Sequence, residues 1–98
     1  MQVKLDENNE LLCPHCDSNY LHHGTVTVYS REEDDAAIVR TEVGLQSTHT
    51  ALVPNAKSGN PSSRRGGFAI TFWCETCNGD SRLTFAQHKG VTAVKWEQ

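Results

Sequence analysis

Two Cys-x-x-Cys pairs constrain the fold of this chain more than any other feature of its sequence. Cys13 and Cys16 form the first pair, and Cys74 and Cys77 form the second. This spacing lets two thiolates grip one tetrahedral ion, and two such pairs complete the closed four-sulfur shell of structural zinc. The sequence therefore predicts one structural Zn²⁺ per chain, held by these four cysteines.

The turns that follow each pair also suit such a site. In knuckles of this kind the residue after the second cysteine often needs a positive φ, which Asn and Asp tolerate better than other non-glycine residues. Asp17 and Asn78 occupy these positions, and Gly79 follows Asn78. The backbone amides of such turns can donate hydrogen bonds to the cysteine sulfurs and stabilise the thiolates.

Other uses of the cysteines remain open at this point. Four thiolates also suit iron or an iron–sulfur cluster, and the first pair has the form of a redox dithiol. That chemistry normally requires a helix N-terminus, whereas a strand pattern follows Cys16. A histidine could also replace one cysteine ligand; the candidates are His15, His22, His23 and His88.

Length and composition explain why a metal would be needed. A chain of 98 residues is long enough for one domain, 1–98. Only 37% of its residues are hydrophobic, and so small a core often requires a disulfide, a metal or a partner. The net charge of −3 argues against a general nucleic-acid coat protein.

Alternating apolar and polar residues predict an all-β fold. Segments 20–31 and 36–43 are expected to pair as a long hairpin whose turn is the acidic run 32–35. Val26 and Val28 share one face of the first segment. Further strands are expected at 68–74, 81–86 and 91–96. In these strands Phe68, Ile70 and Phe72 share one face, and Leu83 and Phe85 point inward. In the second strand of the hairpin, Ala37, Val39 and Val43 share a face.

Segment 44–67 is rich in Ser, Thr, Gly, Pro and Asn, and we interpret it as a long, flexible surface loop. Arg64 and Arg65 lie within it and could grip phosphates, with Lys57 nearby in the sequence, or they could pair with the acidic run. Trp73 lies on the face opposite Phe72 and could stack on a base or on a partner side chain. These four residues are the candidate nucleic-acid or partner-binding residues.

The two cysteine pairs, each next to a β-hairpin, resemble a zinc ribbon over residues 11–31 and 67–86. The resemblance implies a zinc ribbon elaborated by a long hairpin and a long loop. The chain is also similar to small zinc-ribbon proteins of unknown function from bacteria and their phages, and this similarity implies no activity. The stretches that carry it are Tyr20-Leu21-His22-His23, Arg31-Glu32-Glu33-Asp34, Asn60-Pro61-Ser62-Ser63-Arg64-Arg65-Gly66 and Ala86-Gln87-His88-Lys89-Gly90.

Together these features predict a non-catalytic binding module with a macromolecular partner. A closed four-cysteine site offers no open position for a substrate, so we do not expect an enzyme. The negative charge favours a protein partner, in an interaction or inhibitor role, over nucleic acid bound through Arg64 and Arg65. We expect a cytoplasmic location and no membrane association, because no signal-peptide or membrane-spanning stretch occurs in the sequence.

Overall fold

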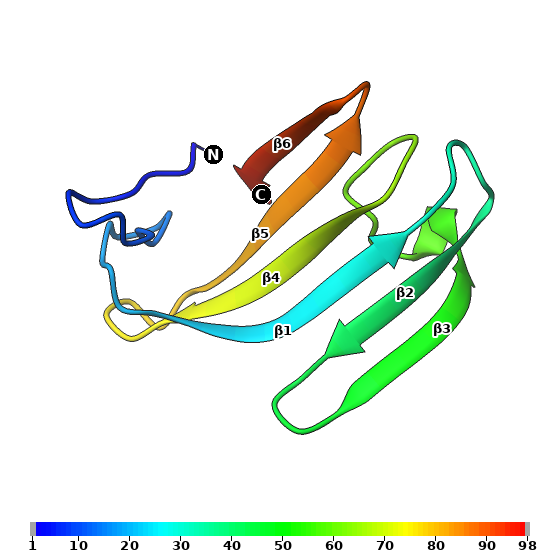
Figure 1. The fold of residues 1–98 in the computed structure, drawn as a ribbon. Helices are drawn as coiled ribbons and strands as arrows, with labels where there is room; N and C mark the ends of the chain where they lie inside the picture. Colours follow the sequence, from blue (N-terminus) through cyan, green and yellow to red (C-terminus); the bar gives the residue numbers. More distant parts are fainter. Residues whose placement is uncertain (1, 98) are drawn as a thin grey trace.

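The computed structural model describes residues 2–97 and consists of one six-stranded antiparallel sheet (Figure 1). The strands lie in the order β3-β2-β1-β4-β5-β6. Among the described residues, no helix has the length and apolar composition needed to cross a membrane. The elements are β1 (Leu21–Ser30), β2 (Ala37–Val43), β3 (Thr48–Pro54), the 3₁₀ turn η1 (Asn55–Lys57), β4 (Gly67–Cys74), β5 (Asp80–His88) and β6 (Val91–Trp96).

The all-β prediction is confirmed, and five of the six strands fall where the alternating patterns predict them. β1 and β2 form the expected antiparallel hairpin, in which Val26 lies opposite Val43. β4, β5 and β6 follow as a meander on the other side of β1. β1 therefore lies at the centre of the sheet and joins the two hairpin systems.

The prediction of a loop throughout 44–67 is wrong for Thr48–Pro54, which form the edge strand β3. β3 pairs with β2 over its whole length, and the hydroxyl groups of Thr41 and Thr50 are hydrogen-bonded across the pair at 3.0 Å. An edge strand with mostly exposed side chains carries little hydrophobic alternation. Its Thr and Val residues favour a strand, but its pairing with β2 decides the structure.

One face of the sheet, here the covered face, is closed by the chain itself. Tyr29 and Ala69, on neighbouring strands, are buried on this face. Segment 55–66 folds over it, since the carbonyl oxygens of Ser58 and Gly59 accept hydrogen bonds from Arg40 and Arg82, which project from this face. The core cluster of Tyr29, Ile38 and Ala69 therefore lies between the sheet and this segment.

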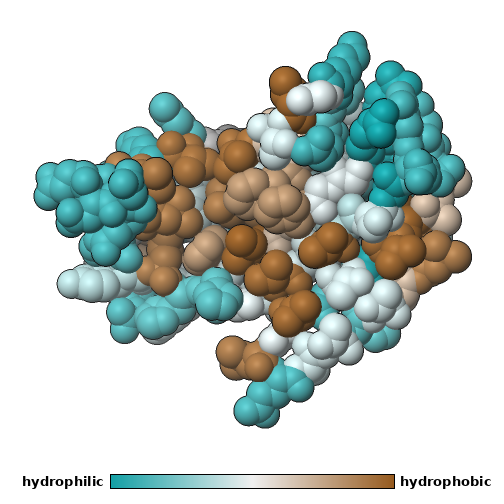
Figure 2. All heavy atoms as spheres, viewed as in Figure 1, coloured by the Kyte–Doolittle hydropathy of each residue, from teal (hydrophilic) through white to brown (hydrophobic). Residues whose placement is uncertain are grey.

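The opposite face, here the open face, carries the apolar side chains that the alternating patterns group together. Directly paired residues share a face, and the register aligns Val28, Phe68, Phe85 and Val94 in one row across four strands. Phe68 and Phe85 stack with ring centroids 4.3 Å apart. Figure 2 shows apolar residues gathered over the middle of the sheet. The predicted shared faces are thus correct, but much of this face is exposed: Val28 is 46% exposed, whereas Leu83 and Trp96 on the same face are buried.

Where segment 55–66 returns to β4, Gly66 lies against the backbone of β1. A Cβ added to Gly66 would clash with the carbonyl oxygen of Tyr29, which cannot swing aside because it belongs to the central strand. We expect Gly66→Ala to lower the free energy of unfolding by about 1–3 kcal/mol, the usual cost of overpacking. Urea denaturation followed by circular dichroism measures this loss.

Gly44 provides the matched control, because a Cβ there would meet the movable hydroxyl of Ser47 at 3.2 Å. Gly44→Ala should change the free energy of unfolding by less than about 0.5 kcal/mol. Equal effects at the two glycines would contradict the close approach of segment 55–66 to β1.

Candidate metal centre

The four cysteines converge at one end of the sheet and form a cluster that can hold one metal ion. Their sulfur atoms all lie within 4.8 Å of one another. The Sγ atoms of Cys13 and Cys77 are 3.8 Å apart, and those of Cys16 and Cys74 are 3.6 Å apart. These distances are far longer than the roughly 2.05 Å of a disulfide. They match the edge of about 3.8 Å of a tetrahedron with metal–sulfur bonds near 2.3 Å.

The two cysteine pairs sit in knuckles of the same backbone design. As the sequence predicts, the residue after each pair has a positive φ, 62° at Asp17 and 57° at Asn78. Each knuckle is closed by the same two hydrogen bonds, counted from its first cysteine. In the first knuckle, Asp17 N–H donates to the Cys13 oxygen and Cys13 N–H donates to the Ser18 oxygen. In the second, Asn78 N–H donates to the Cys74 oxygen and Cys74 N–H donates to the Gly79 oxygen.

Direct polar contacts also join the two knuckles. The hydroxyl groups of Ser18 and Thr76 lie 2.8 Å apart, and Glu75 N–H donates to the carbonyl oxygen of Tyr20 at 3.0 Å. The second knuckle is the turn between β4 and β5, while the first lies just before β1. The cluster therefore joins the N-terminal segment to the middle of the sheet.

Backbone amides point at the sulfurs and change their acidity. The N–H group of Cys77, together with that of Thr76, lowers the pKa of the Cys74 thiol to about 6 against the opposing effect of desolvation. At Cys16 the N–H group of Ser18 lowers the pKa, but desolvation and hydrogen bonds with the neighbouring thiols outweigh it and raise the pKa to about 12. Backbone amides commonly donate hydrogen bonds to the cysteine sulfurs that bind a metal. The four thiols and their amide donors therefore fit a structural ion.

The histidines that were candidate ligands lie outside this cluster. Among residues 2–97, the group of side chains close enough to hold an ion together consists of the four cysteines and contains no histidine. The ring Nε2 of His15 lies 3.3 Å from the carbonyl oxygen of Asp80, and that of His22 lies 3.4 Å from Glu75. His88 ends β5 at the opposite end of that strand from the knuckle.

A groove of about 730 Å³ lies beside the metal cluster, and Trp73 forms part of its wall. Trp73 is 44% exposed and packs against His22, which is its direct partner across β1 and β4, with ring centroids 5.5 Å apart. Pro14 of the first knuckle and Thr71 of β4 also line the groove. The prediction that Trp73 lies on the face of β4 opposite Phe72 is thus confirmed.

Charged side chains at this groove are mainly acidic or already paired. Asp80 and Glu97 line it, and Glu75 lies at His22 near its rim. The one arginine of the lining, Arg82, donates to the hydroxyl of Tyr29 at 2.7 Å and to the Gly59 oxygen, and it forms an ion pair with Glu97. Sequence reasoning missed this cluster, because only the pairing of β4 with β5 places Arg82 beside Thr71.

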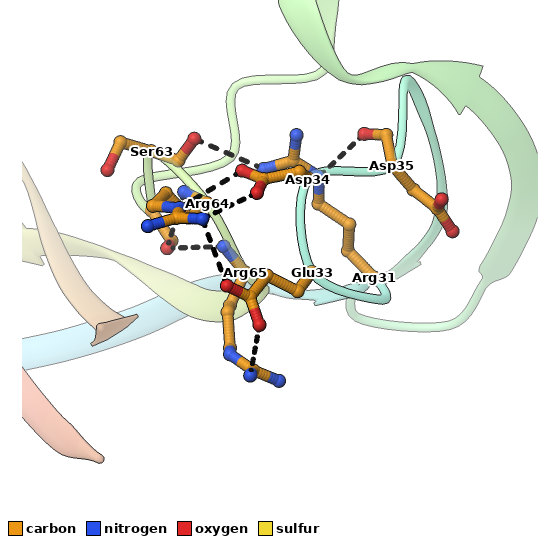
Figure 3. Close-up of polar contacts among 8 residues, drawn as sticks. Arg31, Glu33, Asp34, Asp35, Ser63, Arg64 and Arg65 are labelled. Carbon is orange, nitrogen blue, oxygen red and sulfur yellow. Dashed lines mark hydrogen bonds and ion pairs between the residues drawn. The ribbon is translucent and has the colours of Figure 1, made fainter. Parts of the chain in front are cut away.

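Arg64 and Arg65 lie at the other end of β4 and are paired with the acidic turn, the second of the two roles considered for them (Figure 3). Arg64 donates two hydrogen bonds to Asp34, at 3.1 and 2.7 Å, and lies 3.0 Å from Glu33. Arg65 reaches the other oxygen of Glu33 at 2.7 Å. The hydrogen bonds from Arg64 hold the pKa of the Asp34 carboxyl below its usual value.

The four candidate binding residues therefore do not form one site. Trp73 lies at the metal end of β4, whereas Arg64 and Arg65 precede the start of that strand. Lys57 ends the turn η1, in the segment that closes the covered face. The groove and the paired arginines have to be considered separately.

The positive φ at Asn78 gives a direct test of the knuckle. A β-branched residue costs about 1–2 kcal/mol in this left-handed conformation, whereas glycine adopts it freely. We expect Asn78→Val to lower both the free energy of unfolding and the affinity for metal, and Asn78→Gly to preserve both. Urea denaturation and competition with a chromophoric chelator measure the two quantities. A Val variant as stable and as tightly metallated as the Gly variant would contradict the knuckle geometry.

Comparison with known proteins assigns no family to the chain. No family model matches it, and no match was found among curated proteins or solved structures. The metal centre is therefore supported by its sulfur distances, its matched knuckles and its amide donors.

Proposed function

We propose that this protein is a non-catalytic protein-interaction module whose fold is held by one structural Zn²⁺. Four thiolates in a tetrahedral arrangement suit zinc, and a closed four-sulfur shell keeps no position for a water or a substrate. Sulfurs that all lie within 4.8 Å of one another fit a single ion. A multi-iron cluster would hold its cysteines farther apart.

The knuckles support assignment to the zinc-ribbon type. Two matched knuckles face each other, and the second is carried by the β4–β5 hairpin, as in a ribbon. The zinc ion would tie Cys13 and Cys16 of the N-terminal segment to Cys74 and Cys77 of that hairpin. In a reducing cytosol, where we place the protein, thiols paired in this way serve as metal ligands rather than as disulfides.

The groove at Trp73 is the observation that carries the interaction role. An exposed tryptophan that is held on one side by His22 offers a rigid aromatic surface next to the most constrained part of the fold. Aromatic anchors of this kind carry much of the binding energy at protein interfaces. The three carboxylates of Asp80, Glu75 and Glu97 outnumber the single arginine at the groove, Arg82, and this excess of negative charge favours a basic partner. We therefore propose a protein segment that places an apolar side chain in the groove and an Arg or Lys over Trp73, where a cation–π contact forms.

Charge favours this partner over nucleic acid. Phosphate binding requires cations that are free to replace counterions. Arg64 and Arg65 are instead paired with Glu33 and Asp34, and Arg82 is engaged by Glu97 and Tyr29. Nucleic-acid binding through the Arg64/Arg65 segment remains the alternative role, and it would require those ion pairs to open.

A displayed library of short random peptides tests the proposal on the zinc-loaded protein. We expect enriched peptides to combine an Arg or Lys with a neighbouring apolar or aromatic residue. Binding should change the fluorescence of the exposed Trp73 more than that of Trp96, which is 1% exposed. Trp73→Ala should weaken binding by roughly 30-fold, because aromatic hot spots contribute about 2 kcal/mol.

Leu45→Ala is the matched control, since Leu45 is 93% exposed and lies outside the groove. Its peptide affinity should equal that of the unaltered protein. No enrichment of basic peptides, together with salt-sensitive binding of labelled single-stranded DNA or RNA that is lost in Arg64→Ala/Arg65→Ala, would overturn the proposal in favour of the alternative role.

A further inference from the structure

The open face of the sheet lacks a second layer over most of its strands, although Leu83 and Trp96 on the same face are buried. Six of its apolar side chains are 39–74% exposed, although they come from five different strands. They lie in the rows that the strand register defines, together with half-buried Val26, Ile70 and Phe85. The six are Val28, Val39, Val43, Leu52, Phe68 and Val94.

This face also carries no formal charge in its strands. Within β1 to β6, all of which are described, the register places no Asp, Glu, Lys or Arg on it. The charged strand residues lie on the covered face; Arg40, Glu42, Arg82 and Lys95 are examples. Because this surface carries no charges, two copies of it can pack together without electrostatic repulsion.

A sheet with an apolar face is stable in water when another layer covers that face. Segment 55–66 covers the other side of the sheet, whereas Val28, Phe68 and Val94 on the open face stay exposed. The molecule is accordingly flat, with extents of 39 × 32 × 21 Å. If the open face stayed in water, the apolar side chains of five strands would remain hydrated and would add little to stability.

We propose that two copies of this chain pack their open faces together and form a two-layer β-sandwich dimer. Two sheets pack in this way about 10 Å apart, with their inner side chains interleaved. A two-fold axis lets the same patch serve both copies. The row from Val28 to Val94 lies near the middle of this interface, and Phe68 stacks on Phe85 at its centre.

The available area suits a dimer. The six exposed side chains leave on the order of 500 Å² of apolar surface, in the upper part of the roughly 300–600 Å² found for the largest patch of a typical monomer. With the half-buried neighbours and the intervening threonines, a face-to-face contact approaches the roughly 800 Å² per partner of a stable interface. The groove at Trp73 is a separate feature, so the dimer does not depend on the proposed partner.

Sedimentation equilibrium of the metal-loaded protein tests the dimer directly. The unaltered chain should sediment with twice its mass of 10.9 kDa at micromolar concentrations. Val28→Glu should raise the dissociation constant of the dimer by at least roughly 100-fold, because each copy would bury an unpaired carboxylate. Val39→Lys tests the same face with the opposite charge, should Val28→Glu fail to fold.

Val91→Glu is the matched control. Val91 is also an exposed valine, at 62%, but the register places it on the covered face, opposite His88. The Val91→Glu substitution should leave the dissociation constant of the dimer unchanged. All folded variants should have the same circular dichroism spectrum and metal content. A monomer at every concentration tested would overturn the proposal, as would equal effects of Val28→Glu and Val91→Glu.

Discussion

The four-sulfur cluster is the constraint on which the rest of the structure depends. It joins the N-terminal segment, which is held internally by the bridge between Leu5 and Leu11 and a few backbone hydrogen bonds, to the turn between β4 and β5. The apparent binding free energy of a structural zinc ion, about 10–16 kcal/mol, is as large as the whole free energy of unfolding of a small domain, about 5–15 kcal/mol. Metal binding and folding are therefore expected to be one event.

The metal centre could be predicted from the sequence because its chemistry is local. Two short motifs fix the ligands, and the positive φ of Asp17 and Asn78 follows from the turn that each motif requires. The strand segments could also be predicted, since alternation over a few residues defines which side chains share a face. β3 was missed because an exposed edge strand depends on hydrogen bonds to its neighbour rather than on apolar side chains.

Properties that depend on the pairing of distant segments could not be predicted. Nothing local to Arg64 or Arg65 decides between phosphate binding and pairing with the acidic run, and the structure pairs them with Glu33 and Asp34. Likewise, alternation shows that Val28 and Phe68 point away from Tyr29 and Ala69, but it does not show which face the chain will cover. The covering segment 55–66 is held by polar contacts of Arg40 and Arg82, so it covers the face that carries these charged side chains.

The most direct test of the metal-dependent fold is elemental mass spectrometry on protein purified without added metal. It is combined with circular dichroism before and after treatment with a chelator. We expect one zinc ion per chain and loss of the β-sheet signal when the zinc is removed. Iron in place of zinc, no metal at all, or a sheet that persists without the ion would contradict the proposal that a structural zinc holds this protein together.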